Sequence, residues 1–217
     1  QVNLLKYMGK YRKKRNPEIY NYMCKQIEEI EKIINEISVI EDEKIDLIRQ
    51  DIMTLEAKEN KKYWQTVTKI LPEKVEFTGR ETRGAVDLVN SMLNYGYAIL
   101  YSHVQGAVIL AGLDPFAGFM HVDRSGRASL VLDFVEEFRQ QTVDKTIFAM
   151  INRGTNLELK ENRLTKKTKN KFREELKNKF DSYHQYEGKK EKIKNIIQRQ
   201  ARHIATHLRG EREYVPF

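Results

Sequence analysis

The sequence has very little cysteine and no long apolar run, and each absence narrows what the 217-residue chain can be. Cys24 is the only cysteine, which excludes an internal disulfide framework and a zinc site made of several cysteines. No apolar run approaches the roughly 20 residues that span a bilayer, and no apolar signal segment follows the N-terminal charges. We therefore expect a cytoplasmic protein with no membrane partner, folded as one domain or as two small ones.

Two further signals are missing. No glycine-rich phosphate loop with its lysine is present, which argues against an ATPase or a GTPase. Strong strand signals are also absent, whereas helical periodicity recurs along the chain, so we predict an all-α fold of several helices. The one place that competes is residues 157–166, where apolar and polar residues alternate around Glu161-Asn162 and predict a short β-hairpin, with short helix extensions as the alternative.

Helix boundaries are marked by capping residues. Asn16-Pro17 is an N-cap followed by proline at the first helical position, and Gly112 is placed to end a long apolar helix that we expect to be central. The expected helices cover residues 17–37, 41–71, 86–111, 129–152 with a bend near 140–142, 168–186 and 189–209, with a polar connection at 73–84.

Charge is distributed unevenly along the chain, whose net charge is +8. Residues 1–152 carry 21 basic and 22 acidic side chains, a net charge of −1, whereas residues 153–217 carry 18 and 9, a net charge of +9. A second basic cluster, between Lys6 and Arg15, precedes the first acidic residue, Glu18. This asymmetry suits a polyanionic partner such as nucleic acid, although a solvated basic face is the alternative.

A glycine-broken loop carries His121 toward a helix with Asp133 and Glu136, which share one face because they are three residues apart, while Glu137 should point elsewhere. Burying an unpaired carboxylate in this apolar run would destabilise the folded protein by roughly several kcal/mol, so a partner for the charge is expected. A histidine with two acidic groups suits magnesium or manganese better than structural zinc. Asp123 is a weaker alternative ligand.

A third ligand must come from elsewhere in the chain. Glu56 interrupts an apolar helical pattern and precedes the aromatic pair Tyr63-Trp64, but spacing alone does not choose it over Glu59.

Three blocks occur in this order: Asp87-Leu-Val-Asn90-Ser-Met-Leu-Asn94-Tyr-Gly-Tyr97-Ala-Ile-Leu100, Ala111-Gly-Leu-Asp-Pro115-Phe-Ala-Gly-Phe-Met-His121 and Gly126-Arg-Ala-Ser-Leu-Val-Leu-Asp133-Phe-Val-Glu136-Glu-Phe-Arg139. They resemble the CRISPR-associated spacer-acquisition integrases, a family of metal-dependent DNA endonucleases. The upstream segment Leu55-Glu56-Ala57 to Tyr63-Trp64 is similar to the segment that carries the family's glutamate, with Ala57 where a glycine is frequent.

The resemblance implies a ligand trio of Glu56, His121 and Glu136, with Asp133 as a supporting acid, and magnesium or manganese as the ion. It also implies that the sequence lacks the family's N-terminal β-rich domain, so that a chain beginning at Gln1 is expected to be a fragment. Residues 1–217 would form the helical catalytic domain, with an N-terminal segment at 1–40, a metal-site core at 41–154 and a basic helical tail at 155–217.

The function implied is a divalent-metal-dependent DNA strand transferase or endonuclease that joins spacer DNA to a CRISPR repeat in a prokaryotic cytoplasm. Expected partners are double-stranded DNA, a second copy in the full-length protein and a smaller CRISPR-associated adaptation subunit. The alternatives are a casposase-like transposon integrase and a non-catalytic helical DNA-binding module. Candidate phosphate contacts near the metal are Arg80, Arg83, Arg124 and Arg127.

Overall fold

The computed structural model of the chain describes residues 1–10, 12–40, 44–121 and 125–217. They form two compact units, Gln1–Gly84 and Ala85–Phe217, so the division falls at the end of the polar connection expected at 73–84. The described part is helical apart from two short antiparallel strand pairs, which confirms the all-α prediction. None of its helices is long and apolar enough to cross a membrane.

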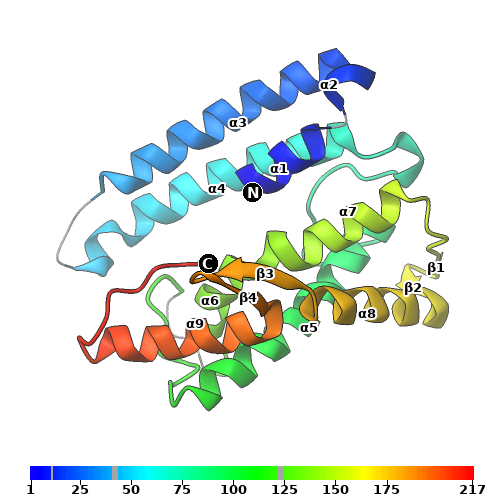
Figure 1. Cartoon of the computed structure of the whole chain (residues 1–217). Helices are drawn as coiled ribbons and strands as arrows, with labels where there is room; N and C mark the ends of the chain where they lie inside the picture. The colour runs from blue at the N-terminus through cyan, green and yellow to red at the C-terminus, as the bar shows by residue number, and fades with distance from the viewer. Residues whose placement is uncertain (11, 41–43, 122–124) are drawn as a thin grey trace. The chain divides into compact units, whose positions relative to one another are not determined.

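The first unit is built on a long helical hairpin (Figure 1). Asn16 caps the first long helix, since its Oδ1 accepts the backbone N–H of Ile19 at 3.1 Å, as the Asn-Pro signal predicts. The two helices pack on each other, and their buried stripes include Ile30 and Tyr63. Two short helices that the sequence analysis did not identify precede them. The elements are α1 (Val2–Gly9), α2 (Arg12–Arg15), α3 (Pro17–Ser38), α4 (Ile45–Ile70) and the 3-10 turn η1 (Glu73–Val75).

Helix α5 (Leu88–Leu110) is the central helix of the second unit, as predicted. It packs against α6 (Ser129–Arg139) and α9 (Ile193–Leu208). Asp87 caps α5 by accepting the backbone N–H of Asn90 at 2.8 Å, and Gly112 follows its end with φ of 74°. The expected bend after α6 is a π-helical turn, η2 (Gln140–Asp144), which leads into α7 (Lys145–Asn152).

One of the two strand pairs lies where the sequence predicted a hairpin, and the other lies where it predicted helix. The hairpin expected at 157–166 is present as β1 (Leu159–Lys160) and β2 (Arg163–Leu164), and the turn residues Glu161 and Asn162 both have positive φ. The helix expected at 168–186 is wrong at its end, because α8 (Lys166–Phe180) stops at Phe180.

A second hairpin occupies the region where that helix and the start of the next were expected. Strands β3 (Tyr183–Tyr186) and β4 (Lys189–Lys192) pair antiparallel, with Tyr186 opposite Lys189. Glu187-Gly188, with φ of 46° and 75°, makes the two-residue turn, which only residues tolerant of positive φ can form. Helix α9 therefore begins at Ile193 and not near residue 189.

Candidate active site

His121 and Asp133 form the centre of the candidate site. Asp133 lies on the second turn of α6, and its side chain is only 5% exposed. Its Oδ1 is 2.5 Å from Nδ1 of His121, which is 29% exposed. A histidine whose Nδ1 is held by a carboxylate presents Nε2 as a free lone pair in a fixed direction, which is how metal-binding histidines are commonly oriented.

Asp133 also fixes the loop that carries this histidine. Its Oδ2 accepts the backbone N–H groups of Phe119 at 2.7 Å and Met120 at 3.0 Å, and its Oδ1 accepts that of His121 at 3.0 Å. Four N–H donors thus share the two oxygens, so the hydrogen-bonding capacity of this buried carboxylate is satisfied within the protein. Asp133 therefore acts on the loop and the imidazole.

Ser129 and Gly118 also hold the loop close to α6. Ser129 donates its hydroxyl to the carbonyl of Phe116 and accepts the N–H of Gly118 at 3.1 Å. A Cβ at position 118 would lie 2.7 Å from the Ser129 backbone and 2.9 Å from Asp133 Oδ2, so only glycine allows this approach. The sequence analysis named neither as a site residue, although the Gly-X2-His spacing before the apolar helix was a usable signal.

Glu136 lies one turn beyond Asp133 on α6, as the spacing predicted, and its side chain is 34% exposed. Its carboxylate pairs with Arg139, whose guanidinium lies 4.1 Å from the centre of the Tyr97 ring. The Tyr97 hydroxyl donates to Asp144, in the π-helical turn, at 2.5 Å. Arg139 was missed as a site residue, although its spacing three residues after Glu136 is one at which helical side chains meet.

The charges of this network stabilise one another. Burial alone would lower the pKa of Arg139, but the acidic groups of Tyr97, Glu136 and Asp144 outweigh it and hold that pKa above its usual value. Arg139 therefore stays charged and keeps the Glu136 carboxylate in place at one oxygen.

Glu137 points elsewhere, as expected, and anchors the end of the chain. It accepts the Tyr214 hydroxyl, the Phe217 backbone N–H at 2.6 Å and the Gln200 amide at 2.8 Å. Burial raises the pKa of Glu137, and burial beside that carboxylate raises the pKa of Tyr214. Between this tail, α6 and α9 lies a pocket of about 500 Å³ whose lining includes Asp133 and His207.

The remaining predicted residues belong to other parts of the chain. Glu56 is an exposed residue of α4 in the first unit, Arg80 and Arg83 belong to the polar connection of the same unit, and Arg127 is exposed just before α6. Arg124 and the alternative ligand Asp123 fall outside the described residues. Within the described part of the second unit, no three His, Cys, Asp or Glu side chains are grouped as a metal site. The geometry thus brings together His121 with Asp133, and Glu136 with Arg139.

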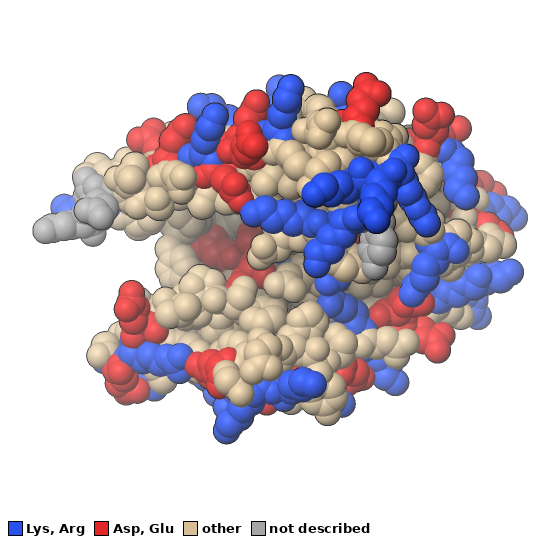
Figure 2. Space-filling view, turned by 45° about the horizontal axis from the view of Figure 1, so that its top comes forward, with Lys and Arg blue, Asp and Glu red and all other residues tan. Residues whose placement is uncertain are grey.

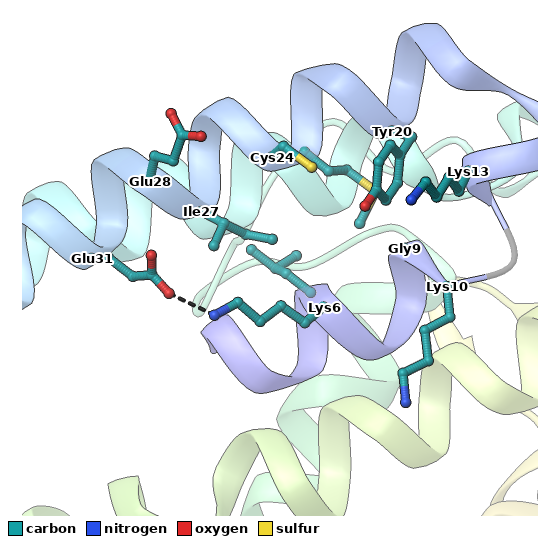
Figure 3. Close-up of a pocket in the computed structure, with 11 residues that line it drawn as sticks. Lys6, Gly9, Lys10, Lys13, Tyr20, Cys24, Ile27, Glu28 and Glu31 are labelled. Carbon is teal, nitrogen blue, oxygen red and sulfur yellow. Dashed lines mark hydrogen bonds and ion pairs between the residues drawn. The ribbon is translucent and has the colours of Figure 1, made fainter.

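The first unit carries the N-terminal basic cluster. Figure 2 shows Lys and Arg side chains gathered over α1 and α2, where Arg12 to Arg15 are four consecutive basic residues. A hollow of about 490 Å³ lies between α1 and α3, with Lys6, Lys10 and Lys13 on one side and Glu28 and Glu31 on the other (Figure 3). Lys6 and Glu31 already pair at 2.6 Å, and the floor is apolar. None of the predicted metal ligands lines this hollow.

With this geometry in view, comparison with known proteins identifies the family. The model of the family described as CRISPR associated protein Cas1 matches residues 1–185. The chain belongs to the Cas1 family. A Cas1 relative from Archaeoglobus fulgidus, named CRISPR-associated endonuclease Cas1 1, is 40% identical over 229 residues, which cover the whole chain and 66% of that relative. The chain spans 45% and 48% of the next two curated relatives, so these Cas1 proteins extend well beyond it.

Solved structures show the same fold at lower identity. A casposase bound to its integration product aligns with a TM-score of 0.77 and 23% identity, covering 99% of the chain and 62% of that protein. A chain of a partial Cas6-RT-Cas1–Cas2 complex aligns with a TM-score of 0.77 and 21% identity, covering the whole chain and 65% of the other. At these identities the likeness concerns the fold.

Proposed function

We propose that this Cas1 chain is the helical catalytic part of a divalent-metal-dependent DNA strand transferase that joins spacer DNA to a CRISPR repeat, and that also cleaves DNA. Membership of a family whose relatives are named endonucleases supports the reaction class. The single observation that carries the proposal is the imidazole of His121, held at Nδ1 by a buried carboxylate so that Nε2 is presented as a ligand.

We assign the metal to His121, Glu136 and Glu56. The donor set fits magnesium or manganese, because one imidazole nitrogen and two carboxylates are ligands that these ions accept. When bound, the ion would polarise the scissile phosphate and stabilise the departing oxygen. In this assignment Asp133 orients His121, and Arg139 holds one oxygen of Glu136 so that the other is available.

In the reaction we propose, a 3′-hydroxyl oxygen of the incoming strand attacks a phosphodiester of the repeat. A new P–O bond forms as the bond to the 3′ oxygen of the target strand breaks, and the hydroxyl proton moves to the released oxygen through solvent. The number of phosphodiesters is conserved. Water in place of the hydroxyl gives the nuclease reaction.

The assembly belongs to the same proposal. The full-length protein would act as a homodimer on double-stranded DNA, in the prokaryotic cytoplasm, together with a smaller adaptation subunit of the Cas2 kind. Similarity to a chain within a Cas1–Cas2 complex supports this partner. Arg80, Arg83, Arg124 and Arg127 are our candidate phosphate contacts. A casposase-like role has less support, since the relatives of higher identity are named as CRISPR proteins.

The test compares two histidine variants of the full-length protein with its partner subunit and a repeat-containing target. His121→Ala should reduce strand transfer by about 100-fold or more, since changes one layer further from a metal already cost about 10- to 100-fold. His103→Ala is the matched control. His103 is a residue of α5, and its ring centre lies 4.4 Å from that of Phe180. This variant should change the reaction rate by less than about twofold. Both should retain the helical circular dichroism of the parent. Normal strand transfer by His121→Ala would reject the proposal.

Metal-dependent thermal stabilisation separates this enzyme from a non-catalytic DNA-binding module. Manganese should stabilise the parent and should fail to stabilise Glu56→Ala and Glu136→Ala. If manganese leaves melting unchanged while DNA still binds, the module is the correct description.

A further inference from the structure

Two lysines and a histidine of the second unit, one each from α7, α8 (Lys166–Phe180) and β3, interact electrostatically with one another. Lys145 begins α7, Lys179 lies in the last turn of α8 and His184 is the second residue of β3. The Nζ of Lys179 is 3.2 Å from Nε2 of His184. The ammonium group of Lys179 is therefore hydrogen-bonded to an imidazole and not to a carboxylate. We call these three residues the cationic cluster.

Burial and nearby positive charge disfavour the charged forms of Lys179 and His184. Burial, with Lys145 nearby, lowers the pKa of Lys179 from 10.5 to about 8. Burial, together with Lys179 and Lys145, lowers the pKa of His184. Positive groups that are partly removed from water and face one another destabilise the folded chain unless an anion joins them.

Among the described residues, neither Lys179 nor His184 forms an ion pair with a carboxylate. Three acids that lie near them in the chain are paired with other cations. Asp181 pairs with Lys194 at 2.8 Å and also with Lys192, and Glu175 pairs with Arg153 at 2.9 Å. Glu187, in the turn of the hairpin, pairs with Arg212.

We propose that the cationic cluster is a binding site for one phosphodiester of a DNA strand, with one unesterified oxygen on Lys179 and the other on His184. Binding would place a proton on His184, so that Nε2 changes from an acceptor of the Lys179 hydrogen bond into a donor to phosphate. A monoanionic phosphate with two free oxygens matches these two donors, and residues 153–217, with 18 basic and 9 acidic side chains, extend the positive field. The choice of DNA over another phosphate source rests on the proposed function.

DNA binding by the full-length protein, measured in EDTA by fluorescence anisotropy, tests the site without catalysis. Lys179→Met keeps the aliphatic stem and should weaken binding by about tenfold, as expected for a hydrogen bond to a charged group. It should also reduce the slope of log K against log salt by about 1. Lys177→Met removes one charge from an exposed position in the same helical turn and should change affinity by less than about twofold. Equal weakening by the two variants would overturn the proposal, since it would indicate a general field effect.

Titration of the His184 ring by NMR gives a second readout. Adding DNA should raise the pKa of His184 in the parent and should leave it unchanged in Lys179→Met. A rise with inorganic phosphate but none with DNA would overturn the assignment to a DNA strand, and no rise with either would overturn the site. The His121→Ala variant should bind DNA in EDTA as the parent does, so loss of the metal chemistry and loss of this site give different results.

Discussion

At the scale of single residues, the account depends on one buried carboxylate that orients one imidazole. Both carboxylate oxygens of Asp133 accept hydrogen bonds from the loop that carries His121. The Asp133 side chain, on α6, is almost fully buried. A neutral amide at this position keeps the shape but must turn an NH₂ group toward a hydrogen-bond donor, which leaves the loop without an acceptor.

Asp133→Asn should therefore weaken manganese binding to the full-length protein by about 10- to 100-fold, measured by isothermal titration calorimetry, while the far-ultraviolet circular dichroism stays the same. Asp114→Asn is the control, because Asp114 Oδ1 accepts the Phe116 N–H at 2.9 Å in an exposed turn that asparagine also forms. Equal metal affinity in parent and Asp133→Asn would show that His121 needs no orienting partner.

Lys179 makes a separate prediction about stability and pH. Its folded-state pKa, about 8, lies below its value of 10.5 in the unfolded chain, so between these values the unfolded state binds more protons. The destabilisation that Lys179 causes is thus full below about pH 8 and fades as pH rises toward 10.5. Lys179→Met should melt higher than the parent at pH 7, and the difference should shrink at pH 10. A difference that grows with pH would contradict the assigned cause.

At the scale of elements, the central helix is positioned by close contact at a glycine. A Cβ at Gly96 would lie 2.6 Å from Val143 Cγ1 and 2.9 Å from Phe172 Cζ, so α5 can approach the π-helical turn and α8 only at a residue without a side chain. Gly106, on the same helix, has open space around the corresponding position.

Gly96→Ala should destabilise the protein by about 1 to 3 kcal/mol, the usual cost of overpacking a core. Gly106→Ala should stabilise it by up to about 1 kcal/mol, because alanine favours helix and meets no neighbour. Chemical denaturation of the two variants measures both changes. Destabilisation of equal size in the two would show that the close contact at Gly96 is not what distinguishes the two positions.

The elements that could be predicted from sequence are those with local end signals. Asn16-Pro17, Asp87 and Gly112 mark helix ends by capping chemistry that involves only neighbouring residues. Strands β3 and β4 were read as helix, because a segment rich in lysine and glutamate has no apolar alternation and its pairing depends on the Glu187-Gly188 turn. Helix α1 has no side-chain cap at its N-terminus that the sequence could indicate.

At the scale of the whole molecule, the candidate site draws on distant parts of the sequence. Periodicity predicted that Asp133 and Glu136 share a face, and the structure has both on α6. It could not predict that Asp133 would turn to the His121 loop, nor that Arg139 would hold Glu136 against Tyr97, because both depend on segments 12 to 42 residues away. The assignment of Glu56 rests on the family resemblance and stays a prediction.

In the proposed site, Glu56, His121 and Glu136 together hold one divalent cation. Anomalous diffraction from crystals of the full-length protein grown with manganese locates such an ion. We expect a single peak within about 2.0 to 2.3 Å of His121 Nε2 and of carboxylate oxygens of Glu56 and Glu136, distances usual for oxygen and nitrogen ligands of such ions. A manganese peak coordinated without Glu56, or no peak beside His121, would contradict it.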